Sequence, residues 1–417
     1  MTKNILIIFL LSNLNSPASN LISDRDSSGG KSFTIASDYY YASDAITNKF
    51  ALTFYKNEFI DDALKNSVSE NLSSQNHFGI GLKGEIKYYS GNKTIFNLSN
   101  SFFSVSINNR FHVNCSFKND AFEIFFRGNK SYAGKTAMLG EFNYEQLLYQ
   151  QINFTFGHIY KINENVFGYS GGISFNKGQK LYTITANRAS LYTQSRGEYI
   201  DLDAGMEIYQ SDSSNNGLSA WNGTGASTDF SFYWLDKKSN KLNLSINNFG
   251  FINWNDQTAY IKVDTSFRFT GVDATELFQF SDSVHETISL DSSLVEPYLT
   301  VREKKSHRTV LPSQLSLSYQ YIITPERFNI EGTLDYLFFA ESTIHESVTF
   351  TYLINNLNSI SLITSNGGYT GFNLGLAFKT RFLKSFLLSV QSDYISSMLN
   401  QNNGQAQGAF VSLTTYF

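Results

Sequence analysis

Acidic side chains recur at alternate positions in one short stretch of this chain, and they form its most suggestive chemical pattern. Asp201, Asp203 and Glu207 fall on one face of an expected strand at Tyr199 to Tyr209. The opposite face is apolar and carries Ile200, Leu202, Ala204 and Met206. Because a carboxylate facing lipid is costly, the acids of a membrane-spanning strand would face the lumen. Two interpretations stay open: solvation or pairing with Lys and Arg of adjacent strands, or an acidic stripe in a pore.

The histidines and the cysteine provide no motif for catalysis or metal binding. The histidines are scattered along the chain, at His77, His112, His158, His285, His307 and His345. They show neither a His-Glu-x-x-His pattern nor a Cys/His spacing, and Cys115 is the only cysteine. We therefore predict that the protein is not an enzyme and has no catalytic residue, metal site or cofactor. An enzyme at the rim of a barrel, whose Ser-His or Asp-His pair would assemble only in space, is the least favoured alternative.

The charge of the chain argues against nucleic acid as a partner. The formal net charge is −4, whereas nucleic-acid binding needs a basic patch. One basic run, Arg302 to Arg308, is expected to be a solvated loop. If this loop lies outside the cell, it could bind anionic lipopolysaccharide.

Composition points to long strands in one large domain. The 417 residues are 16% aromatic and 16% charged, and they include only four prolines. The charged fraction is well below that of an ordinary soluble domain. The scarcity of proline leaves long strands uninterrupted. No linker or shift in composition divides the chain, so one large domain fits better than several.

The final stretch, Gly408 to Phe417, has the pattern of a strand that spans a membrane. One face carries Ala409, Val411, Leu413, Thr415 and Phe417, and the other carries Ser412, Thr414 and Tyr416. Lipid offers the backbone no hydrogen-bond partner, so strands that cross it must pair in a closed barrel with an apolar outer face. An edge strand of a soluble sandwich is the alternative. We predict that Phe417 is an assembly signal that the barrel-assembly machinery reads.

Residues 1–18 have the features of a secretory signal peptide. Lys3 gives a weak positive region, Ile5 to Leu11 an apolar core, and Ser16 to Ala18 a small-residue cleavage site. An apolar core of this length is too short to cross about 30 Å of hydrocarbon. We expect a mobile segment at 19–30 and a barrel at 31–417, which would reach the bacterial outer membrane after the signal peptide is cleaved.

Alternating patterns along the rest of the chain predict an all-β fold, a transmembrane antiparallel β-barrel of about 14 to 18 strands. Helical spacing at Ile60 to Gln75 and Asp120 to Arg127 predicts short helices near the N-terminus. These helices suggest a hatch or plug region at about 60–127, lying at the barrel mouth or inside it. Residues 274–290 are expected to be helical or irregular.

Two irregularities in the alternation carry further predictions. The apolar face changes phase at Asn247 and Asn248, which predicts a β-bulge there, because one extra residue turns every later side chain to the other face. The succession of long and short loops indicates one further strand between Gly271 and Leu311. The candidate for that strand is Val295 to Val301.

Three segments of the chain resemble a known family. The segments at Ser245 to Asn255, Arg127 to Thr136 and Leu311 to Tyr321 are similar to parts of a Bacteroidota outer-membrane β-barrel family of unknown function. That family lies distantly near the long-chain fatty-acid transporter barrels. The resemblance implies a barrel fold and an outer-membrane location, and it implies no catalytic residue.

These observations lead to one functional expectation and its alternatives. We expect a passive channel or transporter for a small solute, hydrophobic solutes included. The alternative is a non-conducting scaffold or accessory of a secretion or surface-assembly complex. An open lumen would favour the channel, and a lumen filled by side chains would favour the scaffold. The expected partners are outer-membrane lipid, lipopolysaccharide, the barrel-assembly machinery and, for the alternative, components of a secretion system.

Overall fold

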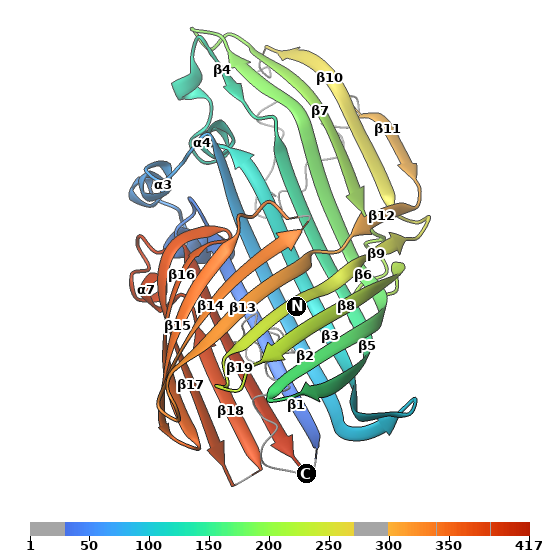
Figure 1. Ribbon diagram of the computed structural model, residues 1–417. Helices are drawn as coiled ribbons and strands as arrows, with labels where there is room; N and C mark the ends of the chain where they lie inside the picture. Colours follow the sequence, from blue (N-terminus) through green and yellow to red (C-terminus); the bar gives the residue numbers. More distant parts are fainter. Residues whose placement is uncertain (1–29, 271–298, 339, 384) are drawn as a thin grey trace.

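Fourteen antiparallel strands form a closed ring in the computed structural model, which describes residues 30–270, 299–338, 340–383 and 385–417 (Figure 1). Each strand pairs with the next, and the last pairs with the first. The ring consists of β1 (Lys31–Ser43), β2 (Gln75–Ile95), β3 (Leu98–Lys118), β5 (Phe142–Ile162), β6 (Asn165–Thr193), β8 (Gly223–Leu235), β9 (Lys241–Trp254), β13 (Ser313–Thr324), β14 (Phe328–Phe338), β15 (His345–Asn355), β16 (Asn358–Gly367), β17 (Thr370–Phe382), β18 (Phe386–Ser392) and β19 (Ala406–Tyr416). The predicted antiparallel barrel is confirmed, at the lower end of the expected number of strands. The predicted signal peptide and the stretch at 274–290 lie outside the described residues.

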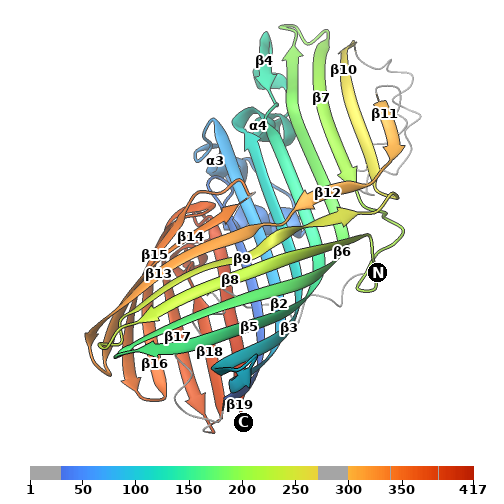
Figure 2. The same ribbon diagram turned by 45° about the vertical axis from the view of Figure 1, so that its right-hand side comes forward.

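A second group of strands, here called the extension, projects beyond one end of the ring (Figure 2). The strand β6 is long enough to pair with β8 through its first half and with β7 through its second half. The extension comprises the second half of β6 together with β4 (Lys135–Met138), β7 (Ile200–Gln210), β10 (Ala259–Phe269) and β11 (Leu299–Lys304). A short strand, β12 (His307–Val310), pairs with the end of β9 beside it.

The extension explains the irregular succession of loops in the sequence. The candidate strand at Val295 to Val301 overlaps β11, which pairs with β10 outside the ring. Since β7, β10 and β11 pair with one another and with the second half of β6, they add no strand to the ring. The correction therefore concerns where these strands pair rather than whether they form.

The two ends of the ring differ in their connections. The turns after β2, β5, β8, β13, β15 and β17 are two to five residues long, and β1 begins and β19 ends at this same side. We call it the short-turn end. The helices and the extension all belong to connections at the opposite side, the long-connection end.

Short helices pack against the outside of the wall near the long-connection end. They are α2 (Asn48–Tyr55), α3 (Asp62–Ser69) and α4 (Asn119–Arg127), with the 3-10 turn η1 (Lys130–Tyr132) following α4 and α7 (Ile395–Leu399) lying apart beside β17 and β19. The Thr47 and Asp61 side chains cap α2 and α3 by accepting from backbone amides. No helix among the described residues is long and apolar enough to cross a membrane.

The position of these helices does not match the hatch expected at 60–127. Buried side chains of all three helices form one cluster with Cys115 and Phe117 of β3. Those two residues alternate with Asn114 and Ser116, which share the face of lumen-lining His112. The α2–α4 cluster therefore lies on the outer face of the wall. The rest of 60–127 supplies ring strands β2 and β3.

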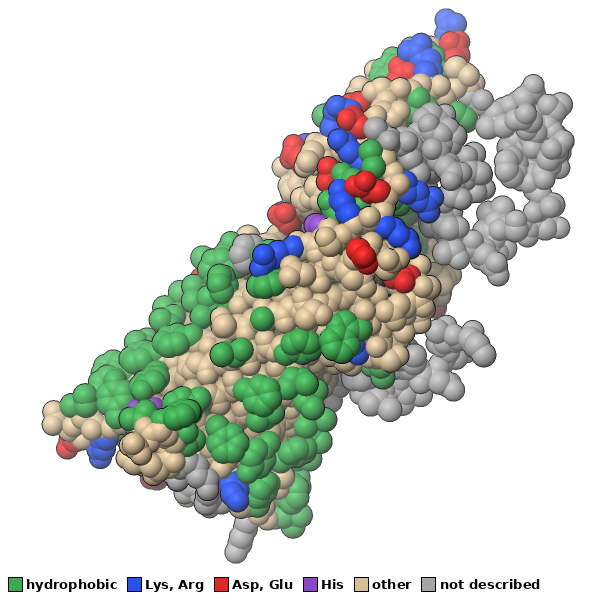
Figure 3. All heavy atoms as spheres, turned by 90° about the vertical axis from the view of Figure 1, so that its right-hand side faces the viewer, with side chains coloured by type: hydrophobic (Ala, Val, Ile, Leu, Met, Phe, Trp, Pro, Cys, Tyr) green, Lys and Arg blue, Asp and Glu red, His purple; other side chains and the backbone are tan. Residues whose placement is uncertain are grey.

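The outer face of the ring is apolar between its two ends. Side by side across four strands lie Ile35, Ile86, Ile107 and Ile152, which are all exposed. Figure 3 shows hydrophobic side chains over much of the ring, whereas charged side chains gather over the extension. The last strand follows the predicted alternation, since Leu413 and Phe417 are exposed and Thr414 and Tyr416 are buried. Such a belt suits contact with lipid.

Candidate functional site

Charged side chains line the inside of the ring on its first three strands. Asp38 of β1 lies opposite Lys83 of β2, which lies opposite Arg110 of β3. One step along, Glu85 lies opposite Asn108. These residues alternate along their strands with the exposed isoleucines of the outer face. Because successive side chains of a strand point to opposite faces, the charged side chains point into the lumen.

Six further strands complete the wall of this cavity, which we call the chamber. Tyr149, Gln151 and Asn153 project from β5, Ser170 from β6, Asp229 from β8, and Asn248 from β9, and Gln314 of β13 and Leu337 of β14 also contribute. The ring thus brings six acidic and basic side chains to one cavity beside His112, namely Asp38, Lys83, Glu85, Lys87, Arg110 and Asp229.

The predicted β-bulge shapes one side of the chamber. Asp229 of β8 lies opposite both Asn247 and Asn248, and Asn248 adopts a left-handed backbone with φ of 61°. The side-chain Nδ2 of Asn248 donates to the Tyr149 hydroxyl at 2.8 Å, and its Oδ1 accepts from Gln151 Nε2 at 3.1 Å. The predicted bulge is confirmed. Without the extra residue Asn248 would face the outside of the ring, and with it the side chain joins a buried network within the lumen.

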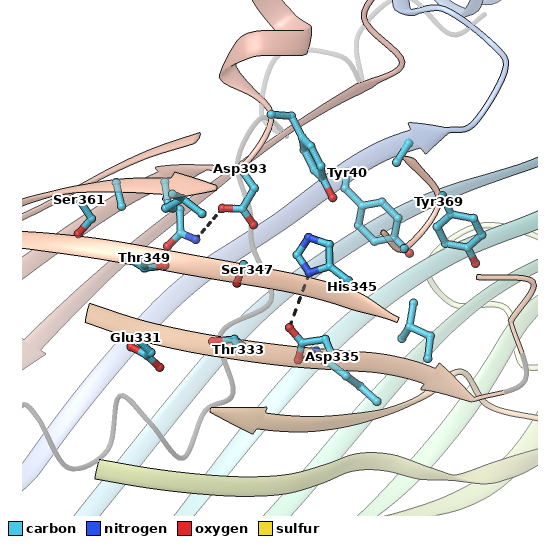
Figure 4. Close-up of a pocket in the computed structure, with 18 of the residues that line it drawn as sticks. Tyr40, Glu331, Thr333, Asp335, His345, Ser347, Thr349, Ser361, Tyr369 and Asp393 are labelled. Carbon is cyan, nitrogen blue, oxygen red and sulfur yellow. Dashed lines mark hydrogen bonds and ion pairs between the residues drawn. The ribbon is translucent and has the colours of Figure 1, made fainter. Parts of the chain in front are cut away.

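A second compartment adjoins the chamber, because Tyr40 and Gln314 line both cavities. Figure 4 shows this second compartment, with His345 and Asp335 pointing toward each other. Its ionisable residues are Glu331, Asp335, His345, Lys379 and Asp393. His345 Nδ1 lies 3.9 Å from Asp335 Oδ2, and Gln314 Nε2 donates to Asp335 Oδ1 at 2.9 Å. This compartment is consequently acidic when His345 is neutral, whereas the chamber carries as many cationic as anionic groups.

Tyr369 narrows the lumen at the long-connection end. It stands on the short connection between β16 and β17, and its ring stacks on Tyr40 at 6.5 Å. Its hydroxyl donates to Asn114 Oδ1 at 3.0 Å, and the same oxygen accepts from the Glu341 backbone amide. A Cβ atom at Gly79 would lie well inside contact distance of the Tyr369 ring. Two loops thus meet β3 above the chamber, and we call this contact the outer constriction.

An apolar cluster narrows the lumen near the short-turn end. Phe102, Ile159 and Tyr233 are buried together there, with Tyr89 and Val166 packed against them. Phe102 shares its strand face with chamber-lining Ser106, and Ile159 shares its face with Gln151. Gly157 and Gly168 make room for the rings, because a Cβ at either position would overlap Phe102 or Tyr233. We call this cluster the inner constriction.

The acidic stripe found in the sequence lies on the extension and does not line the chamber. Asp201 pairs with Arg268 of β10 at 2.6 Å, and Asp203 pairs with Arg188 of β6 at 3.0 Å. Glu207 shares their face with Tyr209, which packs against the buried cluster around Trp254. The stripe lies outside the ring because β7 and β8 share one edge of β6. The strand β8 pairs with the half of β6 inside the ring, and β7 pairs with the half that projects beyond it. Asp201 and Asp203 are therefore paired with cations of adjacent strands, which was one of the two interpretations left open.

The other sequence-predicted positions are dispersed. The basic run at Arg302 to Arg308 spans the end of β11 and the start of β12, where Lys305 pairs with Glu303 at 3.2 Å. Phe417 follows β19, and its backbone amide donates to Lys31. No group of three or more His, Cys, Asp or Glu side chains in the described ranges is placed to hold a metal ion.

The chamber residues were not singled out in the sequence, although a signal existed. Lys83, Glu85 and Lys87 alternate with Leu82 and Ile86, which places three charges on one face of an apolar-backed strand. A solvated strand of a soluble protein has the same pattern. Only the closure of the ring identifies this face as the lumen.

Comparisons with known proteins bear on family and fold. The model of a protein family described as a family of unknown function (DUF5723) matches residues 28–389. No curated protein matches the chain. Similar solved structures include a deltaS2S3 mutant of the TodX monoaromatic hydrocarbon channel, with 9% identity, 93% of this chain and 91% of that chain covered, and a TM-score of 0.48.

Two further solved barrels are similar at the same level. The Ralstonia pickettii toluene transporter TbuX has 8% identity and a TM-score of 0.44, with 93% of this chain and 90% of that chain covered. A Pseudomonas aeruginosa FadL homologue has 8% identity and a TM-score of 0.39, with coverages of 92% and 89%. These values are too low to indicate what this chain binds.

Proposed function

The chain belongs to the family of unknown function DUF5723, and we propose that it is an outer-membrane β-barrel through which a small polar solute passes. The belt of exposed apolar side chains around a closed ring supports a membrane location. Outer-membrane barrels have short turns on the periplasmic side and longer loops outside. The short-turn end would accordingly face the periplasm, and the extension would face the exterior.

The chamber is the observation that carries this proposal. Ionisable side chains at membrane depth are costly and generally mark a pathway for a solute or ion. Here charges from β1, β2, β3 and β8 surround one cavity between two constrictions. A barrel that served only as an anchor could fill this volume with apolar side chains at lower cost. The lining also favours a polar solute over the hydrophobic one that the sequence left open.

Passage would require the constrictions to open. Tyr369 stands on a short turn in which Gly367 and Gly368 both have left-handed backbones, with φ of 88° and 73°. Glycine adopts this conformation without steric cost, so the turn can carry the ring into the mouth. One hydrogen bond and one ring stack hold Tyr369 over the chamber.

Conductance in planar lipid bilayers tests the proposal. The wild-type protein should show rare, brief openings, and Tyr369→Ala should increase the open time several-fold because the ring no longer bridges to β3. Phe372→Ala, an exposed aromatic on the same segment, serves as the matched control and should behave as the wild type. The absence of openings in all three proteins would refute the proposal.

A non-conducting scaffold is the second candidate, and the extension favours it. Among the described residues β11 pairs only with β10, and an unpaired strand edge can accept a strand from another protein. Partners from a secretion or surface-assembly complex, and lipopolysaccharide at the basic run, remain proposals of this kind. Failure of the bilayer experiment would make the scaffold the preferred function.

A further inference from the structure

We propose that the chamber binds a small zwitterionic solute, whose ammonium group is held by Asp38 and whose carboxylate is held by Arg110. The inference deepens the proposed passage of a polar solute and rests on it for physiological meaning. Binding to the chamber can nevertheless be measured whether or not the solute passes through.

The registers of three adjacent strands place the two charges apart. Asp38 and Arg110 lie in one row across β1, β2 and β3, with Lys83 between them. Neighbouring strands are about 4.8 Å apart, so the two residues start about 10 Å from each other. Lys83 forms an ion pair with Glu85 of its own strand. The central cation is thereby engaged, and Asp38 and Arg110 face the cavity as separate poles.

Buried polar atoms without a partner point to a ligand at these poles. Within the described residues, Asp38 Oδ1, Arg110 Nε and Asn108 Oδ1 are buried and make no hydrogen bond. Asp38 and Asn108 are only 8% and 3% exposed, and all three residues line the chamber. Native proteins rarely leave such atoms unsatisfied, so a bound polar molecule is the natural complement.

Of the other acidic groups of the chamber, Glu85 pairs with Lys83 and Asp229 is held by two hydrogen bonds. Asp229 accepts from Asn153 Nδ2 and from the Asn248 backbone amide, each at 2.6 Å. Because three anionic and three cationic residues surround the cavity, neither a simple anion nor a simple cation gains from the net charge. A molecule that carries both charges can satisfy both poles at once.

The chemistry of the two poles assigns the two ends of the solute. A guanidinium presents a planar fork that matches a carboxylate, and the Tyr149 hydroxyl beside Arg110 helps to orient it. A carboxylate such as Asp38 accepts from an ammonium group, which has three donors and no acceptor. Asn108 adds an acceptor on the wall near Arg110. An α-amino acid or a short peptide has the required groups.

Calorimetric titration of the purified full-length barrel with three matched probes tests the inference. L-alanine carries both charges, L-alaninamide lacks the carboxylate, and propionate lacks the ammonium group. We expect the wild-type protein to bind L-alanine about tenfold or more tightly than either analogue, a difference of about 1.4 kcal/mol. Comparable affinities for the three probes, or no binding of L-alanine at millimolar concentration, would overturn the inference.

Isosteric variants separate the two poles. Asp38→Asn should weaken L-alanine binding about tenfold and leave propionate unchanged, whereas Arg110→Gln should weaken both. Asp201→Asn removes a carboxylate from the extension and should leave all three affinities unchanged. Heat-modifiable migration on a gel verifies that each variant has formed its barrel. Unchanged L-alanine affinity in folded Asp38→Asn would contradict the assignment of the ammonium pole.

Transport of the same probes separates this inference from the proposed function. If L-alanine binds as expected but does not cross liposomes that contain the Tyr369→Ala protein, the passage fails and the binding site stands. If all three probes cross at equal rates and bind equally, the passage stands and the zwitterion preference fails.

Discussion

The Tyr369 hydroxyl donates a 3.0 Å hydrogen bond to Asn114 Oδ1, which joins the turn between β16 and β17 to β3 across the long-connection end of the lumen. Both residues are buried, and Asn114 also accepts from the Glu341 amide. One asparagine therefore holds two loops over the chamber. The contact is small enough for single substitutions to alter it.

Enlarging Gly79 should displace Tyr369 and open the outer constriction. A Cβ at Gly79 would overlap the Tyr369 ring, so the ring of Gly79→Ala must leave its position. We expect more frequent openings in planar bilayers, as for Tyr369→Ala. Gly84→Ala on the same strand is the control, because nothing lies within 4 Å of its added Cβ. Identical traces for Gly79→Ala and Gly84→Ala would show that Tyr369 does not gate the lumen.

A methyl group added at the inner constriction should lower the free energy of unfolding. Gly168→Ala places a Cβ against the Tyr233 ring, whereas Gly171→Ala on the same strand meets open space. Overpacking of this kind costs about 1–3 kcal/mol. Urea unfolding of the two variants should therefore differ by that amount, with Gly171→Ala close to the wild type. Equal stabilities would mean that the rings of this cluster are loosely held.

A charge introduced on the outer face should lower the stability of the barrel more in the ring than in the extension. Ile107→Arg places a cation on the apolar outer face of the ring, which we propose faces lipid, and should destabilise the barrel by about 2–4 kcal/mol in lipid. Leu202→Arg on β7 lies outside the ring and should be tolerated better. Refolding into vesicles, followed by urea titration, measures both. Greater sensitivity at Leu202 than at Ile107 would contradict the assigned membrane belt.

The junction between the extension and the ring should weaken in mild acid. His307 stacks on Tyr209 with ring centroids 3.7 Å apart, and burial, followed by the charge of Lys305, lowers the pKa of His307. The folded state thus favours the neutral imidazole. Its contribution to stability is complete above the unfolded pKa of about 6.5 and is lost as pH falls through the lower folded value.

Hydrogen exchange of the β12 amides between about pH 7 and pH 5 reports this loss. After correction for intrinsic exchange, protection should fall in the wild-type protein and stay constant in His307→Gln. Equal pH dependence in the two proteins would exclude His307 as the cause.

The fold was predictable from the sequence because alternation along a strand is a local property. Leu413 and Thr414, or Ile107 and Asn108, differ by one position and face opposite sides of the wall. The bulge at Asn248 was predictable for the same reason. The extension was not, since nothing local distinguishes β7, which pairs beyond the ring, from β8, which pairs within it.

The candidate site was less predictable because its residues converge from distant parts of the chain. Asp38 and Asp229 are separated by most of the N-terminal half, and only the closed ring brings them to one cavity. Likewise, the spacing of Leu64 and Val68 shows that α3 buries one face. The spacing does not show whether that face packs against the outside of the wall or inside the lumen.

Chemical modification of two adjacent positions tests most directly whether solute passes through the chamber. In a Tyr369→Ala, Cys115→Ser background, Ser106→Cys introduces a thiol on the chamber wall, and Ile107→Cys introduces one on the outer face of the ring. A charged, water-soluble methanethiosulfonate reagent should reduce the current through the Ser106→Cys protein and leave the Ile107→Cys protein unchanged. Current that persists unaltered after modification of Ser106→Cys, or no current in either protein, would contradict a passage through the chamber.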